Sequence, residues 1–344
     1  MIYDLAIIGG GPAGVSAGVY ASRKRLKTVF ITKDWNSQSV VSEGIENWIG
    51  TIKISGPDLA KNLERHLKAY SSDIVEIKEG ESCEKIESVE IGKNPETNIE
   101  EIKEEIENNL KESSKKNAEK KSQSKFKIIT SKNSYEARTI LIATGSFRKK
   151  LEVTGADRFE HKGLTYCASC DGPIFARQDV VVVGGGNSAF ESASQLLAYC
   201  KSVTLINRSD KFRADPVTIE TVSKNPHFKI IKNAIPKEVL GEKFVNGFIY
   251  TDSLTKKDIK LDITGIFVEI GSVPTTYFVK DLVEMDEWQH IIVDPKTQRA
   301  SLVDGSTGIW SAGDCTDGLY HQNNIAAGDA VKALEDIYLF LRAK

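Results

Sequence analysis

Long hydrophobic runs and an excess of charge of one sign are both missing from this 344-residue sequence. No apolar run reaches the roughly 18 residues that a membrane-spanning helix needs, so no association with a membrane is predicted. The 46 Lys and Arg residues nearly balance the 48 Asp and Glu residues, and the net charge of −2 predicts no general attraction to nucleic acid. The length exceeds that of one ordinary core and indicates about two domains.

Cysteine is also scarce. The five cysteines are too few for a disulfide framework, which indicates a cytoplasmic protein, and there a CxxC pair is more often catalytic or metal-binding than structural. The N-terminal stretch "MIYDLAIIGGGPAG" has no basic region ahead of its apolar run and enters a glycine turn at once. We therefore expect a strand at this end and not a signal peptide.

A strand–turn–helix–strand unit occurs twice in the chain. In the first copy, the apolar run Leu5–Ile8 ends in "GGGPAG", and "KTVFIT" supplies the second strand. In the second copy, Val180–Val183 ends in "GGGNSA", and "SVTLIN" follows. Because this unit is typical of dinucleotide-binding folds, the sequence predicts an α/β protein with two Rossmann-like domains.

Two further strand-like segments stop at glycine, "TILIATG" at 139–145 and "GIWSAGD" at 308–314. The second lies far from the first unit, which suggests that the first domain is discontinuous and that the second is inserted into it. Residues from about 91 to 124 are rich in Glu and Lys and predict an insertion, one amphipathic helix followed by a flexible basic segment. A solvated extension and a partner-docking segment are both compatible with that composition.

The first glycine turn carries the spacing Gly9-x-Gly11-x-x-Gly14. Glycines at these positions permit a tight turn and let backbone N–H groups approach a pyrophosphate at a helix N-terminus. Asp34 follows the second strand of this unit and is the candidate acid for the ribose hydroxyls of the nucleotide. An exposed loop aspartate with no ligand is the alternative interpretation.

The second glycine turn contains Gly184 and Gly186. Asn207, which is not an acid, follows its second strand, and Arg208 and Arg213 come next. A missing acid with arginines nearby favours a 2′-phosphate over a free 2′-hydroxyl, and so NADP over NAD. The alternative is that both arginines are merely surface charges.

The segment "TYCASCDGP" contains Cys167 and Cys170, separated by two small residues. A structural zinc site usually needs a second such pair, and the sequence has none. A structural disulfide would close only a tiny loop and stabilise the fold little. We favour a redox couple that forms and breaks a disulfide, with Asp171 as the proton carrier, and expect no metal.

These segments together resemble the low-molecular-weight thioredoxin reductases, which are homodimeric flavoenzymes. The resemblance covers most of the chain apart from the charged insertion. The motifs that carry it are "GGGPAG", "IENWIG", "ATG", "CASCDG", "GGGNSA", "NRSDKFR", "IFVEIG" and "AGDC…YHQ", all in the family's order and spacing.

The resemblance implies a three-layer ββα arrangement in each domain. Residues 1–150 and 275–344 would bind FAD, and residues 151–274 would bind NADPH and carry the redox disulfide. The FAD-contact candidates are Gly9, Gly11, Pro12, Ala13, Gly14, Asp34, Gln38, Asn47, Ala143, Thr144, Gly145, Gly313, Asp314, His321, Gln322 and Asn323. The candidates for the pyridine nucleotide are Gly184, Gly186, Asn187, Ser188, Arg208 and Arg213.

The reaction implied is the transfer of electrons from NADPH, through FAD, to the Cys167–Cys170 disulfide and on to a thioredoxin- or glutaredoxin-like protein. In the family, the inserted domain rotates so that the disulfide meets first the flavin and then the protein substrate. A homodimer is implied as well.

The sequence departs from the family at three motifs that concern the cofactors. In the FAD loop, the family's Gly-Gly-Gln reads Asn36-Ser37-Gln38 here. The NADPH motif His-Arg-Arg-x-x-x-Arg reads "NRSDKFR" here, which removes one phosphate-binding arginine. The donor is therefore NADPH or, as the alternative, a carrier such as reduced ferredoxin. The motif Tyr-Arg-Gln reads Tyr320-His321-Gln322, so His321 lies beside the flavin ring or only fills the place of the arginine. A third hypothesis is a nucleotide-binding regulator without turnover.

Overall fold

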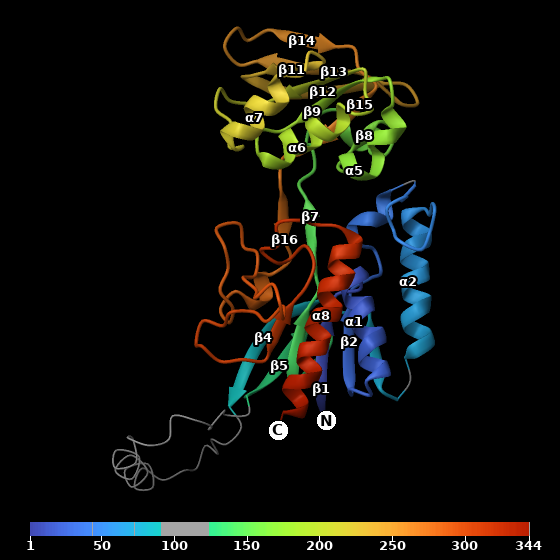
Figure 1. The fold of residues 1–344 in the computed structure, drawn as a ribbon, viewed down its shortest axis with the longest axis vertical. Coiled ribbons are helices and arrows are strands. Elements are labelled where there is room, and N and C mark those ends of the chain that lie inside the picture. The colour runs from blue at the N-terminus through green and yellow to red at the C-terminus, as the bar shows by residue number, and fades with distance from the viewer. Residues whose placement is uncertain (43, 72, 91–123, 344) are drawn as a thin grey trace, which may run out of the picture. The chain divides into compact units, whose positions relative to one another are not determined.

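The computed structural model describes residues 1–42, 44–71, 73–90 and 124–343 (Figure 1). The chain divides into two compact units. Unit 1 consists of Met1–Trp35, Leu63–Gly145 and Pro274–Lys344, and unit 2 consists of Asn36–Asn62 and Ser146–Val273. The charged insertion expected at about 91–124 lies outside the described residues, apart from its last position. The boundaries near 150 and 275, and the cofactor assigned to each domain, stay predictions.

Unit 1 is a sheet with helices on one face. In chain order its elements are β1 (Ile2–Ile8), α1 (Pro12–Arg23), β2 (Thr28–Thr32), the larger part of α2 (Gly56–Tyr70), β3 (Val75–Glu79), β4 (Cys83–Glu90), β5 (Ser124–Thr130), β6 (Ser134–Ile142), the 3₁₀ turn η3 (Tyr277–Val279), β17 (Ile309–Ser311) and α8 (Asn323–Arg342).

Among the described residues the sheet of unit 1 has seven strands in the order β3-β2-β1-β6-β5-β4, with β17 also paired to β6. The long strand β6 pairs with two different strands along one of its edges. Its first half pairs antiparallel with β5 (Phe126 opposite Ala137), and its second half pairs parallel with β17 (Trp310 opposite Leu141). A strand from the C-terminal part of the chain thus completes the sheet that β1 begins.

The two faces of this sheet have separate cores. On one face α1 and α8 run side by side (Figure 1), and alanines from both helices, including Ala17 and Ala330, are fully buried in one apolar cluster with Leu67 of α2. Small side chains let the two helix backbones approach closely. On the other face a segment that contains Phe278 and Ile291 packs with side chains of β4 and β5.

Unit 2 contains a parallel sheet, an antiparallel sheet and short helices. Its elements are η1 (Gln38–Val41), the start of α2, β7 (Ser146–Arg148), α4 (Ala156–Phe159), β8 (Leu164–Thr165), α5 (Ala168–Asp171), η2 (Gly172–Phe175), β9 (Asp179–Val183), α6 (Asn187–Leu196), β10 (Ser202–Ile206), α7 (Pro216–Ser223), β11 (Phe228–Ile231), β12 (Ala234–Gly241), β13 (Val245–Asp252), β14 (Asp258–Leu261), β15 (Gly265–Val268) and β16 (Ser272–Pro274).

The parallel sheet of unit 2 has the order β11-β10-β9-β15-β8 in the described part of the chain. Strand β9 is buried along nearly its whole length, as expected for a parallel strand that is covered on both faces. One face packs on α5, α6 and α7 through residues such as Phe190 and Leu196. The other packs on the antiparallel sheet β12-β13-β14 through Phe248 and Tyr250. Unit 2 is therefore the predicted ββα sandwich.

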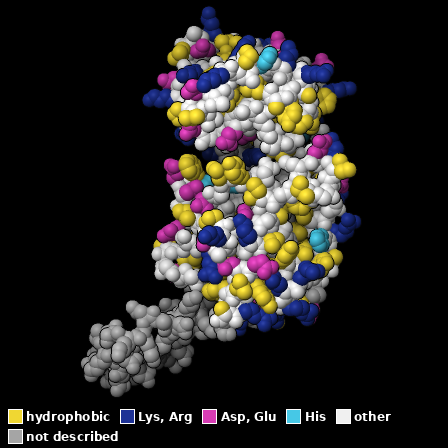
Figure 2. All heavy atoms as spheres, in the orientation of Figure 1, with side chains coloured by type: hydrophobic (Ala, Val, Ile, Leu, Met, Phe, Trp, Pro, Cys, Tyr) yellow, Lys and Arg dark blue, Asp and Glu magenta, His cyan; other side chains and the backbone are white. Residues whose placement is uncertain are grey.

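The surface mixes charges of both signs. In Figure 2, Lys and Arg side chains alternate with Asp and Glu side chains over the visible face of each unit, and neither unit presents a broad field of one sign there. Within the part of the chain that the structure describes, no helix combines the length and the apolar character that crossing a membrane would require.

Candidate active site

The glycine turn of unit 1 joins β1 to α1 and packs on the end of β6. Gly9 has a φ of +124°, and a Cβ there would lie 2.2 Å from the backbone oxygen of Ala143. Only glycine fits, because the neighbouring atom belongs to the backbone and cannot turn away. The contact brings the first turn together with the predicted segment Ala143–Gly145. Thr144 in that segment donates its hydroxyl to the carbonyl of Thr275 at 2.6 Å.

Three element ends meet at this turn. Helix α1 begins after Gly11, which provides no side-chain cap, so the first N–H groups of α1 have no capping side chain. Gly313 follows β17, and a Cβ there would touch Ala13 of α1 and Ala326 of α8, at 3.5 and 3.2 Å. At the start of α8 the N-cap residue is Gln322, and its side chain makes no capping hydrogen bond. Uncapped helix starts beside glycine turns fit the pyrophosphate of FAD.

The other FAD candidates are divided between the two units. In unit 1, Asp34 is exposed, and its backbone oxygen lies against Gly10, where a Cβ would be 2.7 Å away. Asp314, Gln322 and Asn323 lie at the end of β17 and the start of α8, and Pro12 and Gly14 lie in the first turn of α1. Gln38 and Asn47 belong to unit 2. There the Gln38 amide donates to Ser146 Oγ at 2.9 Å and accepts from Arg148 Nε at 3.1 Å.

A histidine pair in unit 1 includes His290, which belongs to no motif of the sequence. His290 Nδ1 is bonded to Asp286 Oδ2 at 2.9 Å, and the His290 ring lies 6.0 Å from the ring of His321. His290 Nε2 is buried, and the described residues offer it no hydrogen-bond partner. The spacing of four between Asp286 and His290 was the available signal. A buried ring nitrogen without a protein partner, beside a predicted FAD contact, fits a bound polar ligand.

The glycine turn of unit 2 joins β9 to α6. Gly184 has a φ of +155°, and a Cβ there would lie 2.2 Å from the backbone oxygen of Glu269. At Gly186 a Cβ would meet nothing within 4 Å, and α6 starts after Gly186 with no side-chain cap. The turn is thus packed on the protein at its first glycine and open at its third, as a phosphate-binding turn requires.

Replacing Gly186 with alanine is expected to leave the fold intact and to weaken binding of the pyridine nucleotide by about ten-fold or more, because only a bound pyrophosphate would meet the added methyl group. Melting temperature and titration calorimetry with NADP⁺ would check this. The matched variant Gly184→Ala has no room for its methyl group and is expected to lower the melting temperature. A Gly186→Ala protein with wild-type affinity would show that the nucleotide does not approach this turn.

The loop that follows β10 packs against the glycine turn of unit 2. Asn207 is buried and donates its amide to the carbonyl oxygens of Ser209 and Lys211, at 3.1 and 2.8 Å. The backbone N–H of Arg213 donates to the carbonyl of Gly185 at 2.8 Å. Both Arg208 and Arg213 are exposed. The asparagine therefore holds the loop that presents the two predicted phosphate-binding arginines, and a further bond from Asp215 N–H to Asn187 Oδ1 at 2.8 Å ties that loop to α6.

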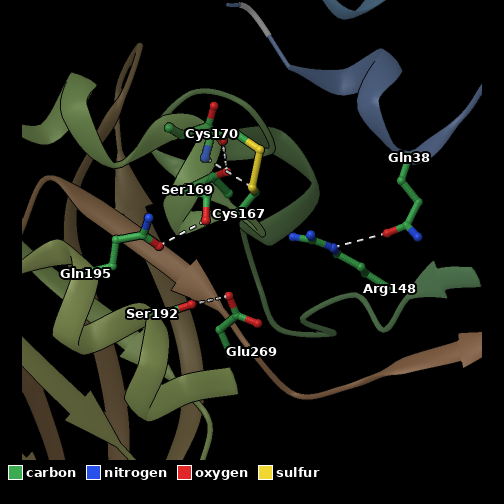
Figure 3. Close-up of a disulfide and its surroundings, with 10 residues drawn as sticks. Gln38, Arg148, Cys167, Ser169, Cys170, Ser192, Gln195 and Glu269 are labelled. Carbon is green, nitrogen blue, oxygen red and sulfur yellow. Dashed lines mark hydrogen bonds between the residues drawn. A yellow bond between two sulfur atoms is a disulfide. The ribbon is translucent and has the colours of Figure 1, made fainter. Parts of the chain in front are cut away.

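The cysteine pair lies at the start of α5, and its two sulfurs form a disulfide (Figure 3). The backbone N–H of Cys170 donates to the Cys167 sulfur at 3.1 Å. Thr165 donates its hydroxyl to the Asp171 carboxylate, which keeps the predicted proton carrier beside the pair. Between the cysteines, the exposed Ser169 donates to Gln195 Oε1 on α6 at 3.0 Å, so the helix after the glycine turn also holds the disulfide loop.

The remaining cysteines are buried and are not in disulfides. Burial raises the pKa of Cys200 to about 11 and raises the pKa of Cys315 above its ordinary value. Burial raises the pKa of Cys83 as well. These side chains are therefore thiols at neutral pH and poor nucleophiles, as expected for small residues of the core.

Comparisons with known proteins show which family the chain belongs to. A family model described as "Pyridine nucleotide-disulphide oxidoreductase" matches residues 3–330. The NADH dehydrogenase of Bacillus subtilis (strain 168) is 32% identical over 331 residues, which are 96% of this chain and 57% of that protein. A component of the alkyl hydroperoxide reductase of Pseudomonas putida is 33% identical over 332 residues, 96% of this chain and 56% of that protein. The chain spans little more than half the length of these two relatives.

Two solved structures match over nearly their whole length. The thioredoxin reductase from Streptococcus pyogenes MGAS5005 is 30% identical with a TM-score of 0.80, and the match covers 100% of this chain and 99% of that one. The thioredoxin reductase from Giardia duodenalis is 29% identical with a TM-score of 0.82, and covers 99% of each chain. The predicted fold class, α/β with two Rossmann-like domains, is confirmed by these likenesses.

Proposed function

Because the chain belongs to the pyridine nucleotide-disulphide oxidoreductase family, as its resemblance to thioredoxin reductases predicted, we propose that it is a flavin-dependent disulfide reductase acting on a thioredoxin-like protein. The family and these solved relatives imply FAD and a pyridine nucleotide as cofactors. The observation that carries the proposal is the disulfide between Cys167 and Cys170 in the same compact unit as the second glycine turn. Bound FAD would supply the two-electron chemistry that links a hydride donor to a disulfide.

The residues around the disulfide have distinct tasks in this proposal. Reduction of the disulfide takes up two electrons and two protons. Once the bond is open, the N–H of Cys170 stabilises a thiolate on Cys167, since it already donates to that sulfur. Asp171, held by Thr165, delivers or accepts a proton at the pair.

The reduced pair then exchanges with the partner. One cysteine attacks the partner's disulfide as a thiolate and a mixed disulfide forms. The second cysteine then attacks this mixed disulfide as a thiolate, so that Cys167 and Cys170 are oxidised again. The two protons taken up on reduction pass to the partner's sulfurs, and the partner leaves as a dithiol. Ser169 and the small neighbours of the pair leave space for a partner sulfur, since Ser169 is exposed. A thioredoxin- or glutaredoxin-like protein, small and with an accessible disulfide, is the proposed substrate.

The proposed donor is NADPH, supported by the exposed Arg208 and Arg213 on the loop beside the second turn. Two observations favour other donors. A relative is named NADH dehydrogenase, which brings NADH into consideration. The altered motif "NRSDKFR" keeps reduced ferredoxin as an alternative. A cytoplasmic location and a homodimer complete the proposal, supported by the scarcity of cysteine and by the resemblance, respectively.

An anaerobic titration of the purified protein with NADPH, NADH and reduced ferredoxin, one at a time, tests the proposal. We expect NADPH to bleach the visible flavin absorbance and a thioredoxin disulfide to restore it. Bleaching by NADH or by ferredoxin alone would replace the donor and keep the reductase. If a reduced flavin could not be reoxidised by any thioredoxin-like disulfide, the proposed function would be wrong, and a regulator without turnover would be favoured.

A further inference from the structure

Glu269 lies where the crevice of the unit 2 sheet is expected. It directly follows β15, which is the neighbour of β9, while the chain leaves β9 for β10 on the opposite side. Nucleotides bind outside the carboxyl ends of the strands at such a reversal of strand order. The backbone of Glu269 contacts the phosphate turn: its N–H donates to the carbonyl of Val183 at 2.8 Å, and its oxygen faces Gly184.

Among the residues that the structure describes, the side chain of Glu269 has one hydrogen-bond partner, and that partner is neutral. Ser192 on α6 donates its hydroxyl to Glu269 Oε1 at 2.7 Å (Figure 3). Arg148 on β7, the cation whose charge acts on this carboxyl, donates its Nε to Gln38 at 3.1 Å. Within the described ranges no ion pair involves Glu269, so its negative charge is not neutralised by direct contact with a cation.

The charges that act on this carboxyl come from two elements. Burial raises the pKa of Glu269 to about 7, Arg148 lowers the pKa, and Glu191 on α6 raises it. The hydrogen bond from Ser192 also lowers the pKa, because it favours the ionised form. The carboxyl therefore holds a proton for a substantial fraction of the time near neutral pH, when no nucleotide is bound.

We propose that Glu269 takes up a proton when the pyridine nucleotide binds at the Gly184 turn, so that affinity for the nucleotide falls as pH rises. The inference rests on the proposed function. A pyrophosphate at this turn is negatively charged, and in a crevice of low dielectric it repels an ionised carboxylate. A protonated Glu269 removes this repulsion and can donate its O–H to the ligand. Binding the anion therefore raises the fraction of Glu269 that is protonated.

The test is titration calorimetry on the full-length protein with FAD bound, using the oxidised nucleotides NAD⁺ and NADP⁺ so that no electrons are transferred. The binding enthalpy is measured in two buffers of different ionisation enthalpy, and the difference between the two values gives the number of protons that the complex takes up. We expect affinity to fall about five- to ten-fold between pH 6 and pH 8, with uptake of part of a proton near neutrality. NAD⁺ has no phosphate that titrates in this range, whereas the 2′-phosphate of NADP⁺ does, with a pKa of about 6.

Three variants test whether the proton taken up on binding goes to Glu269. Glu269→Gln keeps the shape of the side chain and an oxygen that can accept from Ser192. This variant is expected to bind the nucleotide at low pH as tightly as the wild type. It is expected to lack the part of the proton uptake that Glu269 contributes. Glu191→Gln removes the neighbouring acid of α6 and is expected to keep the uptake. Ser192→Ala removes a bond to the ionised form and is expected to move the midpoint of the pH dependence upward.

The outcomes separate the two proposals. If the wild type binds nucleotide with no proton uptake, or if Glu269→Gln keeps the full pH dependence, the role of Glu269 is refuted and the reductase stands. If neither nucleotide binds the wild type at pH 6, the pyridine nucleotide site of the proposed function is wrong, and the inference falls with it. Should Glu269→Gln fail to fold, an unmoved midpoint in Ser192→Ala would overturn the assignment.

Discussion

Replacing Cys170 with serine is expected to reduce the turnover of a thioredoxin disulfide by at least about a thousand-fold, because an alcohol cannot form or release a mixed disulfide. The steady-state rate of thioredoxin reduction measures this. The effect of Cys167→Ser should be as large, since the two sulfurs act as one disulfide. Bleaching of the flavin by the electron donor should survive in both variants, which separates loss of the dithiol from loss of the cofactor.

The matched control is Cys200→Ser, a buried cysteine of the same unit that forms no disulfide. It is expected to keep turnover close to that of the wild type. A count of thiols in the denatured protein provides a second readout: three in the oxidised wild type, from Cys83, Cys200 and Cys315, and all five after reduction. Turnover in Cys170→Ser within ten-fold of the wild type would show that the pair is not the redox centre.

Replacing Gly9 with alanine is expected to abolish FAD binding and to destabilise the fold by at least about 2 kcal/mol, because the backbone is in the left-handed region and the methyl group would meet Ala143. The oxygen of Ala143 would lie only 2.2 Å from the new Cβ, and a backbone atom at the end of β6 cannot turn away. The ratio of flavin to protein absorbance after purification, and the melting temperature, measure the two effects.

Gly328→Ala is the control for this substitution. Gly328 lies in α8 of the same unit, and a Cβ there would meet nothing within 4 Å. Alanine in a helix interior is favoured over glycine by roughly 0.5–1 kcal/mol, so this variant should bind FAD normally and melt at the same or a higher temperature. A yellow Gly9→Ala protein with an unchanged melting temperature would contradict the role given to the first glycine turn.

Much of the fold could be predicted because its signals are local. A short apolar run that ends in a glycine turn is typical of the first strand of a Rossmann-like unit. The apolar runs before Gly9 and Gly184 therefore identified both units. The C-terminal strand was found for the same reason. Its partner was not, because pairing of β17 with the second half of β6 depends on how far β5 extends along the same edge.

The candidate site was predictable where chemistry is carried by neighbours in sequence, as in Cys167, Cys170 and Asp171. It was not predictable where the chemistry depends on burial. His290 had no visible role until the fold placed it against Asp286 and His321. In the sequence, Asn207 is notable only because an acid is expected at its position. In the structure, its side-chain amide holds the loop that carries the two arginines.

The sequence by itself determined the two glycine turns, the vicinal cysteine pair and the family, because glycine spacing and neighbouring cysteines are properties of short segments. Only the tertiary structure decided which carboxyl has a pKa near neutrality. Glu269 appears in the sequence as one more acid in "IFVEIG". It acquires its raised pKa because β15 ends beside the Gly184 turn, where burial removes water and outweighs the opposing effect of Arg148. Desolvation depends on all surrounding elements at once, and no spacing along the chain encodes it.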